Sequence, residues 1–208
     1  IESYWLLYGP QNTSSTKKDN LKLSFYNLCK WLYDGTIDYD LISEAMLDEH
    51  ASVENANFNV GLMSYNTIVV PPLITLRSST VKLLNEFISN GGKLIFTGKS
   101  PTHVDAIFNS EVINLYNNST VIKFDKVTIL NELSSEKTAE IYDNSGKPAE
   151  NYVHQLRIDG EFKWFFLAHS TRPYKTNEID VSKSHNLTIC FDGEYIPKLY
   201  DTINGEIL

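Results

Sequence analysis

The stretch NTIVVPPLITLRSSTVKLLNEFISNGGKLIFTG, residues 66–98, decides the fold. Its apolar, β-branched start at 67–70 is typical of a strand buried on both faces, and Pro71-Pro72 ends it because proline cannot donate to a ladder. We expect Ser78 or Ser79 to cap the helix that follows, since a serine oxygen accepts a free N–H of the first turn. The apolar stripe of this helix consists of Val81, Leu84, Phe87 and Ile88.

Gly91-Gly92 ends this helix, and residues 93–97 form the next strand. A strand, helix and strand joined by short turns predict a right-handed crossover between parallel strands. The same alternation continues through residues 1–135 and favours a flavodoxin-like, glutamine-amidotransferase-like doubly wound sheet. The other strands expected there are 4–8, 37–42 and 121–124, and the other helices are 18–33, 44–50, 104–116 and 127–133.

The pattern changes after residue 135, so we place a domain boundary there and expect residues 136–208 to form a small antiparallel β segment. Strand-like runs are separated by turn residues at 144–146, 159–160 and 192–193. The segment is small for an independent sandwich, so it resembles a partial one. We expect it to depend on the α/β part or on chain beyond these 208 residues.

The composition excludes some classes of function. The chain has 208 residues and a formal net charge of −8, which argues against a nucleic-acid partner because phosphates require a basic face. No apolar run approaches the roughly 18 residues of a membrane helix, so no membrane partner is expected. Cys29 and Cys190 are interpreted as buried free thiols, which favours the cytoplasm while the compartment stays open. The chain starts at Ile1, and we interpret it as part of a longer protein.

Ligands of a doubly wound sheet bind beyond the carboxyl ends of its strands, and the first such loop precedes the first expected helix. Its hydroxyl residues Thr13, Ser14 and Thr16 could hold a phosphate or a flavin mononucleotide at the helix N-terminus. However, the loop lacks the glycine that flavodoxin loops carry among their hydroxyl residues. We therefore predict an ordinary capped loop and no cofactor.

Two further loops carry polar candidates. Arg77 could pair with a carboxylate, but the turn before it has no cysteine, and Ser78 and Ser79 stand at a helix start and not in a nucleophile elbow. His103 and Asp105 could form an acid–base pair or supply two metal ligands, although no third ligand is evident. No metal site is therefore predicted, and no pair of glycosidase carboxylates stands out.

Aromatic residues gather in the β segment, and two interpretations stay open for them. They could form a platform on which a sugar stacks, with Trp164 as its first candidate, or they could pack against another domain. Neighbouring residues on a strand point to opposite faces, so at least one ring must point away from its own core. The residues in question are Trp164, Phe165, Phe166, Tyr195 and Tyr200.

Four segments together resemble part of large multidomain glycoside hydrolases of the α-L-rhamnosidase and β-galactosidase types. Residues 65–98 resemble the accessory α/β domain of these enzymes, and IDYDLISEAML at 37–47 resembles the segment before it. HQLRIDGEFKWFFLAHSTRPYK at 154–175 and PKLYDTINGEI at 197–207 are similar to the β domain that follows. The resemblance covers most of the chain in order.

This resemblance implies that the catalytic carboxylates belong to a barrel outside this sequence. We therefore predict no catalytic residue here. The implied role is a non-catalytic unit that contacts other domains of the same protein or the subunits of a homo-oligomer. The alternatives are a module that binds a carbohydrate, a phosphate or a flavin, and an amidotransferase-like enzyme, against which the missing nucleophile argues.

Overall fold

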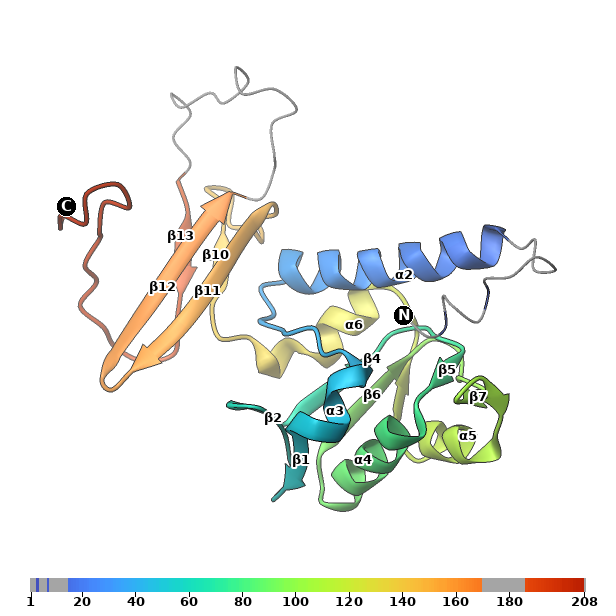
Figure 1. Cartoon of the computed structure of the whole chain (residues 1–208). Coiled ribbons are helices and arrows are strands. Elements are labelled where there is room, and N and C mark those ends of the chain that lie inside the picture. Colours follow the sequence, from blue (N-terminus) through green and yellow to red (C-terminus); the bar gives the residue numbers. More distant parts are fainter. Residues whose placement is uncertain (1–2, 4–6, 8–14, 170–185, 208) are drawn as a thin grey trace. The chain divides into compact units, whose positions relative to one another are not determined.

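The computed structural model describes Ser3, Leu7 and residues 15–169 and 186–207. The chain divides into two compact units, residues 1–136 and 137–208 (Figure 1). The fold is mixed α/β, and its described residues form one parallel sheet, one small mixed sheet and three small antiparallel sheets. None of the described helices is both long and apolar enough to cross a membrane.

A parallel sheet lies at the centre of the first unit and confirms the expected crossover. Strand β4 (Thr67–Val70) pairs with β6 (Lys93–Thr97), which pairs with β9 (Thr120–Ile122). Helix α4 (Ser78–Ser89) connects β4 to β6, and its stripe buries Val81, Leu84 and Phe87. A short strand β5 (Thr75–Leu76) precedes α4.

The turn between α4 and β6 explains why two glycines stand there. Gly91 has a φ of 90°, a left-handed conformation that favours glycine. The Gly92 N–H donates to the Phe87 carbonyl oxygen at 2.9 Å, which closes the last turn of the helix. A Cβ on Gly92 would overlap the Phe87 ring, so the backbone can approach the ring this closely only because Gly92 has no side chain.

Helices cover both faces of the parallel sheet, as Figure 1 shows. Side chains of β6 alternate between two apolar clusters, with Leu94 and Phe96 in one and Ile95 in the other. The first cluster includes residues of α4 and of α5 (Ser110–Asn117), and the second includes residues of α2 (Ser15–Asp34) and α6 (Lys126–Glu132). A sheet packed on both faces explains the continuous apolar strands in the sequence.

A buried charge connects α2 to α6. The Asp34 carboxylate lies 2.8 Å from the Lys30 ammonium and 3.7 Å from that of Lys126. Asp34 is buried, so both ammonium groups compensate a carboxylate removed from water. Helices α2 and α6 confirm the helices predicted at 18–33 and 127–133, and β9 confirms a strand that overlaps 121–124.

An antiparallel meander that the sequence pattern did not predict follows α3 (Glu44–His50). Its strands are β1 (Ala51–Glu54), β2 (Asn57–Val60) and β3 (Met63–Tyr65). The predicted strand at 37–42 is wrong, because this segment joins no ladder. Its side chains hold it instead: the Tyr65 hydroxyl donates to Asp40 Oδ2 at 2.8 Å. Burial, with this bond, raises the pKa of Tyr65 to about 12.

The predicted helix at 104–116 is wrong in its first half. Strands β7 (His103–Val104) and β8 (Ile107–Phe108) form a hairpin there, and β7 pairs with β5. Asp105 and Ala106 both have positive φ values, 49° and 66°, which a two-residue hairpin turn requires and a helix excludes. The helix α5 begins only after Asn109, whose side chain accepts from the Glu111 N–H at 2.7 Å.

The second unit consists of two small antiparallel sheets after the short 3-10 helix η1 (Ser134–Glu136). Strand β11 (Tyr152–Asp159) pairs with β12 (Phe162–His169). The turn between them consists of Gly160 and Glu161, one residue later than the predicted turn at 159–160. Strand β10 (Glu140–Tyr142) pairs with β13 (Thr188–Cys190).

One prediction about single residues needs correction, and one predicted strand lies almost entirely outside the described part of the chain. Both thiols are free as expected, but Cys190 is exposed and Cys29 only half-buried, so neither is a fully buried thiol. The predicted strand at 4–8 lies, except for Leu7, outside the described residues.

Candidate functional site

A shallow depression lies at the N-terminus of α4, beyond the end of β5. Its volume is about 490 Å³, and it is open to solvent. Two acidic and two basic side chains and two hydroxyl side chains line it, so it is mixed in charge. The lining residues are Asp48, Arg77, Ser78, Ser79, Lys82 and Asp105.

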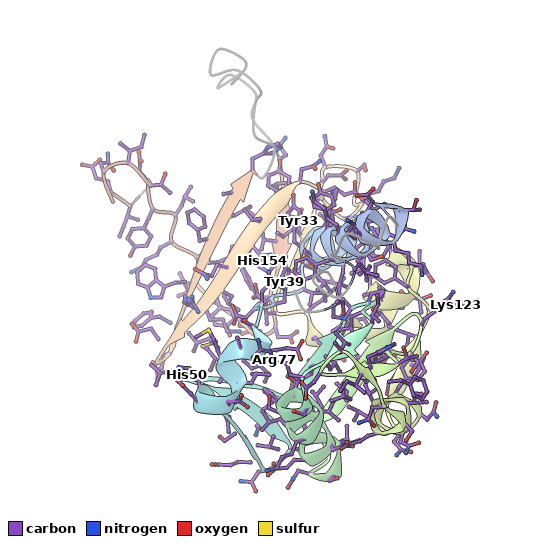
Figure 2. The ribbon with its side chains drawn as sticks, turned by 45° about the vertical axis from the view of Figure 1, so that its right-hand side comes forward. Tyr33, Tyr39, His50, Arg77, Lys123 and His154 are labelled. Carbon is purple, nitrogen blue, oxygen red and sulfur yellow. The ribbon has the colours of Figure 1, made fainter. Side chains whose placement is uncertain are left out.

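Three elements far apart in sequence position these side chains. Helix α3 contributes Asp48, the start of α4 contributes Arg77 and Lys82, and the turn of the β7–β8 hairpin contributes Asp105. Figure 2 labels Arg77 near the start of α4. Two hydrogen bonds fix the hairpin turn on β5, from Asp105 N–H to the Leu76 carbonyl at 2.9 Å and from Ala106 N–H to Thr75 Oγ1 at 3.0 Å.

Two of the N–H groups at the start of α4 are bound by carboxylates of the chain itself. Glu44 Oε2 accepts from the Arg77 N–H at 2.8 Å, and Asp105 Oδ1 accepts from the Ser78 N–H at 3.1 Å. The N-cap residue is Arg77, so the prediction that Ser78 or Ser79 caps the helix is wrong. Carboxylates are the natural partners of a helix N-terminus, whose N–H groups carry partial positive charge.

This arrangement limits what the depression can do chemically. An incoming phosphate would have to displace Glu44 and Asp105 from the helix N-terminus, where they already take the place of an anion. Ser78, which also lines the depression, is fixed there by the hydrogen bond from its N–H to Asp105. The site therefore has the features of a structural junction with a polar, mixed-charge surface.

The structure brings together some of the predicted site residues and separates others. Arg77 and Asp105 line one depression, as expected for loops at one edge of a sheet. His103 is adjacent in sequence but does not line it, because its Nδ1 lies 2.8 Å from Thr102 Oγ1 and its ring meets the Phe108 ring edge-on at 6.2 Å. His103 and Asp105 therefore do not line one depression together.

The remaining candidates lie elsewhere. Thr16 is exposed in the first turn of α2, while Thr13 and Ser14 lie outside the described residues. Trp164 belongs to β12 of the second unit. In the described part of the chain, no cluster of three or more histidine, cysteine, aspartate or glutamate side chains could hold a metal ion.

Sequence reasoning missed Glu44, Asp48 and Lys82. The spacing of Glu44 and Asp48 is i, i+4, which places both on one face of α3, and this was the only signal available. Nothing in the local sequence indicates that this face meets the start of α4. That pairing depends on the packing of α3 against α4, which involves Leu47 of the first apolar cluster.

Comparison with known proteins gives a likeness of fold to one solved structure at low sequence identity. No family model matches the chain, and no curated protein matches it. Among solved structures, the apo exo-carrageenase GH42 from Bacteroides ovatus aligns with a TM-score of 0.51 and 8% sequence identity. The alignment covers 89% of this chain and 24% of that chain. At this identity the likeness shows a shared fold, and it extends over about a quarter of the hydrolase.

Proposed function

We propose that the chain is a non-catalytic accessory unit of a glycoside hydrolase, which contacts other domains of that enzyme or a second subunit. The observation that carries the proposal is the alignment of 89% of this chain with 24% of a GH42 exo-carrageenase chain. An alignment that nearly exhausts this chain while leaving most of the enzyme unmatched is what an accessory unit would produce.

The geometry at the start of α4 supports a structural role for this part of the chain. In the depression there, Glu44 and Asp105 accept hydrogen bonds from two of the helix N–H groups. Within the proposal, the first unit is a flavodoxin-like domain related to amidotransferases. Unlike an amidotransferase, it has no cysteine nucleophile in the turn before α4. The second unit is a partial β-sandwich, and the enzyme is of the rhamnosidase or galactosidase type.

The first test measures turnover by the chain alone. The purified 208-residue chain is incubated with a panel of aryl glycosides and with κ-carrageenan, and released chromophore and reducing ends are measured. We expect no turnover. Hydrolysis that the variant Asp105→Asn abolishes would overturn the proposal, because it would place a catalytic carboxylate in this chain.

The second test addresses the accessory role. A polypeptide that joins the chain to its catalytic barrel is compared with one that lacks residues 1–208. We expect the shorter enzyme to keep its kcat within about tenfold, because the catalytic carboxylates remain, while its melting temperature or its oligomeric state changes. Unchanged stability and assembly would count against a contact role.

A further inference from the structure

The outward face of the β11–β12 hairpin carries a row of three exposed aromatic rings. Phe162, Trp164 and Phe166 are 70%, 50% and 56% exposed, and they alternate along β12 with partly buried residues. The intervening Phe165 points to the opposite face, where its ring meets the Phe191 ring edge-on at 4.9 Å. Residues two apart on a strand share a face, so the three rings form one line about 13 Å long.

A row of polar side chains stands directly opposite this aromatic row. The ladder pairs Gln155 with Phe166, Arg157 with Trp164 and Asp159 with Phe162. All three polar residues are exposed. Partners in an antiparallel ladder lie on the same face, with Cβ atoms about 5 Å apart. An amide, a guanidinium and a carboxylate therefore line one side of the aromatic row.

This face differs from one built to pack against a second sheet. In a sandwich core, the inward residues of both strands are apolar. On the opposite face, the apolar residues Leu156 and Phe165 are paired and both are partly buried. On the outward face, a covering sheet would instead bury the charged side chains of Arg157 and Asp159. Burying a charge without a well-placed partner costs on the order of several kcal/mol for each ion.

Tyr200 extends the aromatic row beyond the hairpin. Its ring lies 5.6 Å from that of Trp164, tilted by 46°. A small turn holds it in place: Tyr200 bridges to Ile207, and the Asp201 N–H donates to the Glu206 carbonyl at 2.8 Å. The aromatic surface is therefore built from two separate segments and does not rest on a single strand.

We propose that this face binds a polysaccharide chain. The C–H groups on the face of a pyranose ring are weakly positive, so they stack on the negative face of an aromatic ring. The hydroxyl groups at the edge of the sugar then reach the amide, guanidinium and carboxylate groups of the opposite row, which donate and accept hydrogen bonds. This inference is independent of the accessory role.

Arg157 divides the glycans into two classes. Its planar guanidinium can hold a sulfate ester through two parallel hydrogen bonds, as it holds carboxylate and phosphate. In a neutral glycan the guanidinium would instead donate to hydroxyl oxygens, and these hydrogen bonds are weaker because the acceptor carries no charge. The shared chemistry is that of a pyranose polymer, and the experiment distinguishes the sulfated from the neutral form.

The test is affinity electrophoresis of the 208-residue chain in polyacrylamide gels that contain κ-carrageenan, agarose or hydroxyethylcellulose. We expect retardation in at least one of the three gels and at least a tenfold weaker interaction for Trp164→Ala. Tyr26→Ala is the matched control, because it removes an aromatic ring that is 62% exposed on α2 of the first unit. Weakening by Arg157→Ala in the carrageenan gel only would identify a sulfated ligand.

Further variants keep the proposal falsifiable if Trp164→Ala disturbs the hairpin. Phe166→Ala and Gln155→Ala change opposite strands of the same face, and each should also reduce retardation, with circular dichroism as the check on folding. No retardation in any of the three gels would overturn the proposal. So would retardation that none of these variants changes, or a dimer in sedimentation that Trp164→Ala dissociates while no gel retards the chain.

Discussion

The two units of this chain place their apolar side chains in opposite ways. In the first unit, two apolar clusters lie on either side of the parallel sheet, and several of their side chains are completely buried. In the second unit, the described residues with buried apolar side chains are Ala139, Ile141 and Ala149. Its larger aromatic side chains are partly or largely exposed, among them Phe162 and Trp164.

This difference indicates what each unit is for. Burial of apolar side chains is the main favourable contribution to folding, so the first unit holds most of the stability of the described chain. Large aromatic side chains that remain in contact with water are typical of binding surfaces. We therefore interpret the first unit as a scaffold and the second as a surface. Substitutions that destabilise the second unit as much as the first would contradict this division.

The largest effect is expected for Phe87→Ala in α4. Phe87 is completely buried and its ring meets that of Phe58 edge-on at 5.8 Å, so its removal leaves a cavity. We expect a loss of about 3–5 kcal/mol in the free energy of unfolding. Urea denaturation followed by fluorescence measures it in a chain whose Trp5 and Trp164 are replaced by phenylalanine. Trp31 is then the reporter, and it packs against Phe124 at 5.0 Å in the first unit. Phe166→Ala is the control, and an equal loss there would refute the contrast.

A smaller effect is expected for Gly92→Ala, which overpacks the same region. The new Cβ would overlap the Phe87 ring, so the ring or the turn must shift, at a cost of about 1–3 kcal/mol. Gly146→Ala in the second unit adds a Cβ that meets no atom within 4 Å, and its φ of 77° leaves only backbone strain of about 1 kcal/mol. Thermal denaturation of both variants tests the ranking, and a larger loss at Gly146 would contradict it.

A smaller loss of stability again is expected when the hydrogen bond from Asp105 to the start of α4 is removed. Asp105→Ala removes the acceptor of the Ser78 N–H, and we expect a loss of about 1 kcal/mol, the typical value of a helix cap. Asp105→Asn keeps an oxygen acceptor and tolerates the positive φ of 49°, so it should retain most of the stability. Urea midpoints of both variants provide the measurement. If the two variants were equally destabilised, the role of Asp105 as a cap would be wrong.

The smallest effect concerns acid. Hydrogen bonds from the Thr128 N–H and hydroxyl lower the pKa of Asp125, and those from Ser145 and Lys147 lower the pKa of Asp143 in the second unit. A carboxyl whose folded pKa is lowered contributes stability above its unfolded value, and this contribution disappears as pH falls through the folded pKa, below 3.8. Asp125→Asn should therefore lower the melting temperature at pH 7 more than at pH 3.

The acid prediction also separates the units. Asp143→Asn should show the same pH dependence when unfolding of the second unit is followed by the fluorescence of Trp164 in a chain without the other tryptophans. It should have little effect on unfolding of the first unit followed by Trp31. Melting curves at pH 7, 5 and 3 supply the comparison. A variant whose melting temperature differs from that of the parent chain by the same amount at every pH would show that the carboxylate charge has no part in the effect.

The candidate site was only partly predictable, because its parts come from different elements. The order of the loops placed Arg77 and Asp105 at one edge of the sheet, and the structure brings them to one depression. The expected cap by Ser78 or Ser79 is wrong, since Asp105, 27 residues away, accepts the hydrogen bond instead. A local rule for caps compares residues within one turn, and it cannot weigh an acceptor that packing delivers from elsewhere.

The sequence by itself determined the crossover from β4 through α4 to β6 and the hairpin of β11 and β12. Their signals are local: proline at a strand end, helical spacing, paired glycines and a two-residue turn act on neighbouring residues. Tertiary structure alone decided the short strands at 51–65 and 103–108, because strands of two to four residues are defined by their partners. It also decided which aromatic face of β12 is outward, since Phe191 covers the Phe165 side.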